Sequence, residues 1–251
     1  MATIPQRLGL RALVTRPRAG AAALAEALRA RGIEAIVEPL LEIRYRDGPA
    51  PDLAGVQAVL CTSANGVRAL ARANGERGIS LLAVGEATAV RARAEGFTAV
   101  ASAGGDSADL VRLALARLRP QGGRLLHVAG DVVAGDLVGM LRAQGFVVER
   151  SVLYEARPVV ALSPATVRAL RSGMIDFALF FSPRTAAIFA RLAGIAHVVE
   201  CLATITALSI SRAADTALAG LPWHDRRVAE EPSQPVLLDA LDRVLGERAQ
   251  G

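Results

Sequence analysis

The sequence has no lysine, only two cysteines and few aromatic residues. Without lysine, the chain can neither form a Schiff base nor bind phosphate through a lysine motif. Cys61 and Cys201 each lie in an apolar run, with no second thiol or histidine at ligand spacing, so we expect core residues rather than a disulfide or ligands. The histidines, His127, His197 and His224, are far apart in the sequence. We therefore expect no metal and no cofactor.

Several motifs that mark enzymes and exported proteins are also missing. There is no GxGxxG after a strand, no Walker A motif and no GxSxG. Residues 1–13 lack an apolar core with a cleavage site, and no run of about 18 uncharged apolar residues occurs. We expect a cytoplasmic protein that, if it is an enzyme, acts by positioning and electrostatics.

The formal net charge of +5 comes from arginines that are dispersed along the chain. Arg112, Arg117 and Arg119 are typical, standing singly on a predicted helix with no basic block around them. Only 4% of residues are aromatic, so few side chains can stack on bases. Nucleic-acid and membrane binding are disfavoured, and a small polyanion remains open as a ligand.

Short apolar runs alternate with amphipathic stretches rich in Ala and Leu along the whole chain. Residues 12–14 precede such a stretch at 21–31, and residues 56–61 precede another at 66–72. This alternation is the pattern of βαβ units around parallel sheets. The predicted fold class is α/β.

The chain also contains an internal duplication. Residues 9–43 reappear about 113 positions later as residues 122–156, with Gly32 falling on Gly145. The next unit repeats with Ser63 falling on Ser182. The following pairs are 59–71 with 178–193, 81–97 with 205–221, and 107–118 with 233–245. Four units therefore occur twice, in the same order.

Two extended, β-rich segments beside prolines follow the first βα unit of each repeat, at 40–46 and 152–158. If the chain crosses over there, the first unit joins the last three. We then expect two Rossmann- or flavodoxin-like parallel-sheet domains, one from residues 1–39 and 159–251 and the other from 47–151. The two crossing strands are expected to pair as a short ladder.

Ligands of parallel sheets collect beyond the carboxyl ends of the strands, where helix N-termini present unpaired N–H groups. Hydroxyl and amide side chains suited to N-capping follow the strands that end at Cys61 and Phe181. The candidate ligand-binding residues there are Thr62, Ser63, Ala64, Asn65, Ser182 and Pro183. Plain helix capping is the alternative interpretation.

Two more turns of this kind and three arginines extend the candidate site. Gly85, Thr88 and Ser107 lie in turns that follow predicted strands, and several such helix N-termini together form a receptor for a polyanion. Arg16, Arg184 and Arg212 would add positive charge, unless they are solvated surface residues.

Six motifs then resemble a known family in the order in which they occur. These are LVTRP, CTSANGV, AVGEATA, SVLYEA, FFSPRTAAIF and AEEPSQPVLLDAL. Together they are similar to the uroporphyrinogen-III synthase family over essentially the whole chain. The resemblance implies two α/β domains joined by a two-stranded ladder, and a cofactor-free hydro-lyase. Its substrate would be hydroxymethylbilane, a linear tetrapyrrole with eight carboxylates, bound in a cleft between the domains. The reaction would close this chain into a ring, with loss of water and inversion of its last pyrrole.

The resemblance also implies roles for individual residues. Tyr154 matches the family's linker tyrosine, a proton donor to the leaving hydroxyl, although it would equally anchor a linker strand. Ser63, Thr88 and Ser182 match hydroxyl positions of the family. The chain departs from the family at residues 209–213, where Gly-Pro-x-Thr-Ala is usual and Ser211-Arg212 occurs. There an arginine would replace a threonine, either to bind a carboxylate or as the mark of a paralogue without activity.

Two other functions stay open at the level of sequence. One is a catalytically degenerate, two-lobed module that binds a small polyanion without converting it. The other is a phosphosugar or nucleotide enzyme of flavodoxin-like fold, which the missing glycine fingerprint disfavours. For the synthase we expect a monomer, with possible transient contact with the hydroxymethylbilane synthase that makes its substrate.

Overall fold

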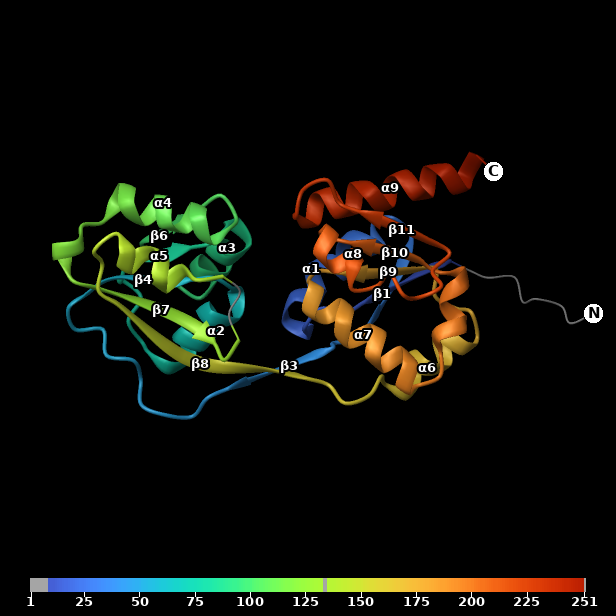
Figure 1. The fold of residues 1–251 in the computed structure, drawn as a ribbon, viewed down its shortest axis with the longest axis horizontal. Coiled ribbons are helices and arrows are strands. Elements are labelled where there is room, and N and C mark those ends of the chain that lie inside the picture. The colour runs from blue at the N-terminus through green and yellow to red at the C-terminus, as the bar shows by residue number, and fades with distance from the viewer. Residues whose placement is uncertain (1–8, 133–134, 251) are drawn as a thin grey trace, which may run out of the picture. The chain divides into compact units, whose positions relative to one another are not determined.

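The computed structural model describes residues 9–132 and 135–250. The first eight residues, part of the segment inspected above for a leader, lie outside the described residues. The chain forms two compact units (Figure 1): unit 1 comprises Met1–Glu42 and Pro158–Gly251, and unit 2 comprises Ile43–Arg157. No helix in the described ranges has the length and apolar character needed to cross a membrane.

Unit 1 is a three-layer α/β structure around a five-stranded parallel sheet of order β11-β10-β9-β1-β2. One face of the sheet packs against α1 and α9, and the other against α6, α7 and α8. The strands are β1 (Leu10–Val14), β2 (Ile33–Val37), β9 (Phe177–Phe180), β10 (Thr206–Ser209) and β11 (Asp225–Val228). The helices are α1 (Arg18–Arg29), α6 (Pro164–Arg171), α7 (Pro183–Ile195), η2 (Val199–Thr204), α8 (Arg212–Thr216) and α9 (Gln234–Gln250).

Unit 2 repeats this plan with the strand order β3-β8-β7-β4-β5-β6. Helices α2 and α3 cover one face of its sheet, and α4 and α5 cover the other. The strands are β3 (Leu41–Tyr45), β4 (Val56–Cys61), β5 (Leu81–Ala83), β6 (Val100–Ser102), β7 (Arg124–Gly130) and β8 (Val148–Pro158). The helices are α2 (Ala64–Ala73), α3 (Glu86–Ala94), α4 (Ser107–Arg117), η1 (Pro120–Gly122) and α5 (Leu137–Ala143).

Strands in such a sheet bury both faces, which is why the predicted strands are continuous apolar runs. In β4, every residue except Gln57 is buried, and in β9 and β10 every residue is buried. The predicted α/β class is confirmed.

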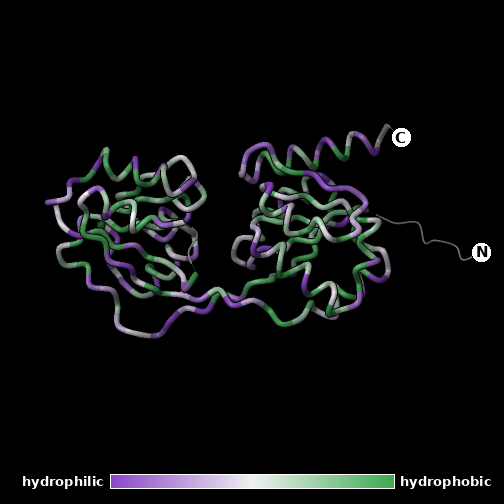
Figure 2. The backbone as a smooth tube through the Cα atoms, viewed as in Figure 1, coloured by the Kyte–Doolittle hydropathy of each residue, from purple (hydrophilic) through white to green (hydrophobic). Residues whose placement is uncertain are grey.

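The predicted ladder forms between β3 and β8. The amide of Arg46 donates to the carbonyl of Leu153 at 2.9 Å, and the amide of Val159 donates to that of Leu40 at 3.1 Å, so the two strands run antiparallel. In Figure 2 the tube is mostly purple, and so hydrophilic, along this crossing. Strand β8 begins at Val148, earlier than the predicted 152, because its first half also pairs with β7.

The strand registers of the two units match each other. In unit 2, Leu60 lies between His127 and Leu82; in unit 1, Leu179 lies between Val14 and Leu208. The two sheets therefore have the same order from β6 to β8 and from β11 to β2. The duplication extends from the sequence to the pairing of the strands.

The registers correct one alignment of the sequence repeat. They make Ser211 of unit 1 the structural equivalent of Gly85 of unit 2, and both residues are helix N-caps. The counterpart of Thr88 is consequently Ala214, a buried residue of α8, rather than Arg212. The sequence comparison was two residues out of register because the repeat is weak here and only strand pairing fixes the offset.

Candidate functional site

Ser63 is fixed at the carboxyl edge of the sheet of unit 2. It follows β4 in extended conformation and caps α2, its Oγ accepting a hydrogen bond from the amide of Gly66 at 3.1 Å. A Cβ on Gly66 would lie 3.1 Å from the carbonyl oxygen of Val128. The first turn of α2 therefore lies tightly against the backbone of β7, and the Ser63 hydroxyl has a defined position.

Tyr154 of β8 brings its phenol to this serine. Its hydroxyl oxygen lies 2.8 Å from Ser63 Oγ, across 91 positions of sequence. The ring packs over Gly130, where a Cβ would come within 2.8 Å of the ring. Only 8% of Tyr154 is exposed, and this burial raises the pKa of the phenol, an effect that the Ser63 hydrogen bond partly offsets. The phenol is therefore protonated at neutral pH and available as a donor.

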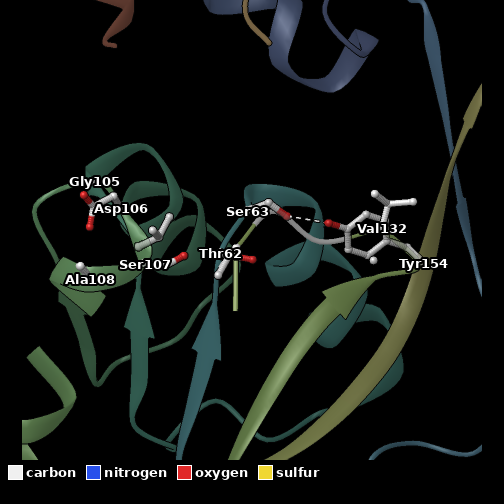
Figure 3. A pocket seen from close by; sticks show the side chains of 11 residues that line it. Thr62, Ser63, Gly105, Asp106, Ser107, Ala108, Val132 and Tyr154 are labelled. Carbon is white, nitrogen blue, oxygen red and sulfur yellow. Dashed lines mark hydrogen bonds between the residues drawn. The ribbon is translucent and has the colours of Figure 1, made fainter. Parts of the chain in front are cut away.

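A pocket of about 630 Å³ opens beside the Ser63–Tyr154 pair (Figure 3). Figure 3 shows the pair at one end and the Gly105–Ala108 turn at the other. The sequence predicted four of its residues, Thr62, Ser63, Ser107 and Tyr154, and they come together here. The remaining lining residues are Val84, Gly105, Asp106, Ala108, Gly130, Val132 and Gly135. Of these, Gly130 could have been found from the sequence, because a glycine at the end of a predicted strand permits the close approach of a side chain.

Four described helices of unit 2, α2 to α5, begin at this edge of the sheet, and the caps of the first three differ in charge. Gly85 caps α3 through its backbone alone, and its loop approaches the next one so closely that a Cβ would lie 3.3 Å from Gly105. Helix α4 is capped by Asp106 in a capping box with Asp109, so Ser107 is the first helical residue and not the cap. The carboxylate cap offsets the positive end of α4, which makes α2 and α3 the better sites for an anion.

The other predicted residues of unit 2 do not line this pocket. Ala64 and Asn65 lie in the first turn of α2, where Asn65 Oδ1 accepts a hydrogen bond from Arg68 at 3.0 Å. Thr88 is only 6% exposed within α3. The described residues also contain no cluster of His, Cys, Asp and Glu that could hold a metal ion.

The remaining predicted residues belong to unit 1. Ser182 caps α7 by accepting from the amide of Thr185 at 3.1 Å, Pro183 is the first residue of that helix, and Arg184 follows half-buried. Ser211 and Arg212 line a second pocket of about 460 Å³ with the segment after β11. Arg16 follows β1 and lies against the ring of Phe181.

Comparison with known proteins gives this geometry its context. A family model described as uroporphyrinogen-III synthase HemD matches residues 22–239. A mutant uroporphyrinogen III synthase from the extremely thermophilic bacterium Thermus thermophilus has a similar structure, with 21% identity, a TM-score of 0.54, and coverage of 95% of this chain and 99% of that chain. Uroporphyrinogen-III synthetase from Helicobacter pylori matches with 19% identity, a TM-score of 0.63, and coverage of 94% and 99%. No curated protein sequence gave a significant match.

The two solved structures share the fold, and the family model, which spans most of the chain, identifies the family. The resemblance predicted from the six motifs is thereby confirmed. The chain belongs to the uroporphyrinogen-III synthase family, the lyases of tetrapyrrole biosynthesis that close hydroxymethylbilane to uroporphyrinogen III.

Proposed function

We propose that Tyr154 is the general acid of this synthase and that the pocket of unit 2 receives the hydroxymethyl end of the bilane. The observation that carries the proposal is the 2.8 Å contact between the Tyr154 hydroxyl and Ser63 Oγ at the wall of that pocket. The phenol is buried, protonated and held over Gly130, so it is a donor in a fixed position.

The reaction follows from the chemistry of the substrate. The leaving hydroxyl takes the phenolic proton and departs as water, and the pyrrole nitrogen stabilises the azafulvene cation that remains. The terminal ring attacks through its substituted position to form a spiro intermediate, which fragments and recloses with that ring inverted. The proton released when the last pyrrole regains aromaticity restores the phenol, so no net proton is consumed.

Ser63 supports the acid by restricting its orientation. One lone pair of Ser63 Oγ is engaged by the Gly66 amide, which leaves the serine one O–H and one acceptor site to share with Tyr154. The phenol therefore cannot rotate freely, and the pair directs one hydroxyl proton toward the pocket. Holding the bilane beside this pair favours ring inversion over spontaneous closure.

The eight carboxylates of the substrate need donors, which helix N-termini and arginines provide. The backbone amides at the starts of α2, α3 and α7 are suited to carboxylates, and arginine side chains add fixed positive charge. We assign carboxylate binding to Arg16, Thr62, Ser63, Ala64, Asn65, Gly85, Thr88, Ser107, Ser182, Pro183, Arg184, Ser211 and Arg212.

The direct test supplies freshly prepared hydroxymethylbilane and resolves the product isomers by chromatography. We expect uroporphyrinogen III, formed faster than spontaneous closure to isomer I. Isomer I alone, at the spontaneous rate, would refute the proposal and leave a polyanion-binding module.

We further propose that the two compact units are the two domains of the family fold, that β3 and β8 are their linkers, and that the chain acts as a cytoplasmic monomer. The dispersed arginines and the hydrophilic crossing strands support this. Light scattering coupled to gel filtration should give the mass of one chain. If the chain makes transient contact with hydroxymethylbilane synthase, the unstable substrate passes directly between the two enzymes. We then expect less isomer I when both enzymes are present together.

A further inference from the structure

The guanidinium of Arg16 lies at the carboxyl edge of the sheet of unit 1. Arg16 comes two residues after β1, and Phe181 comes one residue after the neighbouring strand β9. The guanidinium carbon lies 4.4 Å from the centre of the Phe181 ring. From the first turn of α9, Gln234 reaches the same group, and Arg16 Nη1 donates to its Oε1 at 2.7 Å.

Both contacts of Arg16 are neutral. Its side chain is half-buried, and burial lowers the pKa of its guanidinium. A charge removed from water is usually paired with an opposite charge. Among the described residues, however, Arg16 has no carboxylate partner. Glu230, on the segment that leads into α9, pairs with Arg243 at 2.7 Å instead.

This arrangement holds a cation in place without cancelling its charge. The aromatic face fixes the plane of the guanidinium, the amide oxygen engages one of its five N–H groups, and the others remain for a ligand. A planar donor of this kind fits a carboxylate with two parallel hydrogen bonds. A carboxylate side chain in place of Gln234 would itself pair with Arg16 and compete with the ligand.

We propose that Gln234 is a positioning residue whose neutrality keeps Arg16 available to bind one carboxylate of the substrate. The inference rests on the proposed function for the identity of the ligand. Because the carboxylates of the substrate take no part in bond making or breaking, the contact is made equally in the ground state and the transition state. Its loss therefore affects KM and leaves kcat unchanged.

The decisive variant is Gln234→Glu. It keeps the length of the side chain and the tie to Arg16, and a carboxylate in the first turn of α9 is favoured by the helix dipole. The folded protein should therefore be at least as stable as the wild type. With Arg16 neutralised, we expect KM for hydroxymethylbilane to rise about tenfold, with kcat changed less than about twofold, as expected for loss of one charged hydrogen-bonded contact.

Two controls separate charge from structure. Gln234→Met removes the tie without adding charge and should raise KM only about threefold, since Arg16 keeps its charge and its contact with Phe181. Gly246→Glu adds the same charge to an exposed, open position of α9 and should leave KM unchanged. Equal KM values for Gln234→Glu and the wild type, or equal losses in Gln234→Glu and Gly246→Glu, would overturn the inference.

A second readout does not depend on turnover. Uroporphyrin III, a stable octacarboxylate, can be titrated into each protein by fluorescence. Weaker binding by the two Gln234 variants, weakest for Gln234→Glu and unchanged for Gly246→Glu, supports the role of Gln234. That result would stand even if the wild type makes no uroporphyrinogen III, an outcome that would refute the proposed function only. Equal binding by all four proteins refutes the role of Gln234 whatever the activity.

Discussion

Unit 1 and unit 2 share one framework but carry different functional groups at equivalent positions. Both have a serine N-cap after the middle one of the five strands that the two sheets share, Ser182 after β9 in unit 1 and Ser63 after β4 in unit 2. The sequence repeat aligns Leu41 with Tyr154, which leaves unit 1 without the phenol. Unit 1 instead has the guanidinium of Arg16. The carboxyl edges of the two sheets thus carry a phenol in unit 2 and a guanidinium in unit 1.

The interiors of the two units differ as well. His127 occupies the position of Val14, is 2% exposed, and has no hydrogen-bond partner for either ring nitrogen among the described residues. Glu38 of unit 1 is 5% exposed but fully engaged: it accepts from the amide of Ser163 at 2.9 Å and from two hydroxyls. The buried polar group of unit 2 lacks hydrogen bonds and destabilises the fold, whereas the buried carboxylate of unit 1 is hydrogen-bonded and stabilises it.

Removal of the Glu38 carboxylate should have the largest effect on stability. Glu38 joins the segment before β3 to the start of α6 through Ser163 and Thr166. Glu38→Ala removes the shared acceptor of the buried Thr166 hydroxyl and of the partly buried Ser163 amide and hydroxyl. We therefore expect a loss of about 3 kcal/mol in unfolding free energy by urea denaturation. Glu34→Ala is the matched control, because that side chain is 65% exposed and its ion pair with Arg11 is worth at most about 1 kcal/mol. Equal losses in the two variants would show that these hydrogen bonds are unimportant.

His127 should make unit 2 sensitive to acid. Burial, with a smaller contribution from the positive charge of Arg150, lowers the pKa of His127 to about 4. The unfolded chain, with its histidine pKa near 6.5, therefore binds more protons between these values, and stability falls as the pH drops. We expect a loss of about 2 kcal/mol at pH 5 relative to pH 7.5. His127→Val, which copies Val14 of unit 1, should abolish this contribution. The same pH dependence in both proteins would contradict it.

Tyr154→Phe tests the functional asymmetry directly. The ring still packs over Gly130, but the proton donor is lost, so kcat for uroporphyrinogen III should fall about 10- to 100-fold, the lower range for one positioned acid. Tyr45→Phe is the matched control, because Tyr45 is the only other tyrosine and lies on β3. It should retain the wild-type rate. A folded Tyr154→Phe protein with that rate as well would reduce Tyr154 to an anchor of the linker.

The sequence was informative wherever the pattern is local. Apolar runs located the strands at 12–14 and 56–61. Ser63 and Ser182, each of which follows a predicted strand, cap helices in the structure. The repeat predicted the shared strand order, and the crossing segments predicted the β3–β8 ladder. The comparison of the two repeats was wrong in the weakest unit, where it aligned Arg212 with Thr88.

Sequence alone determined the α/β class, the duplication and the family, because strand periodicity, capping residues and ordered motifs are written in neighbouring positions. Only the tertiary structure decided which groups meet. Tyr154 reaches Ser63 across 91 positions and Arg16 reaches Gln234 across 218, through the order of parallel strands. Strand order depends on the packing of whole layers, so no local pattern specifies these contacts.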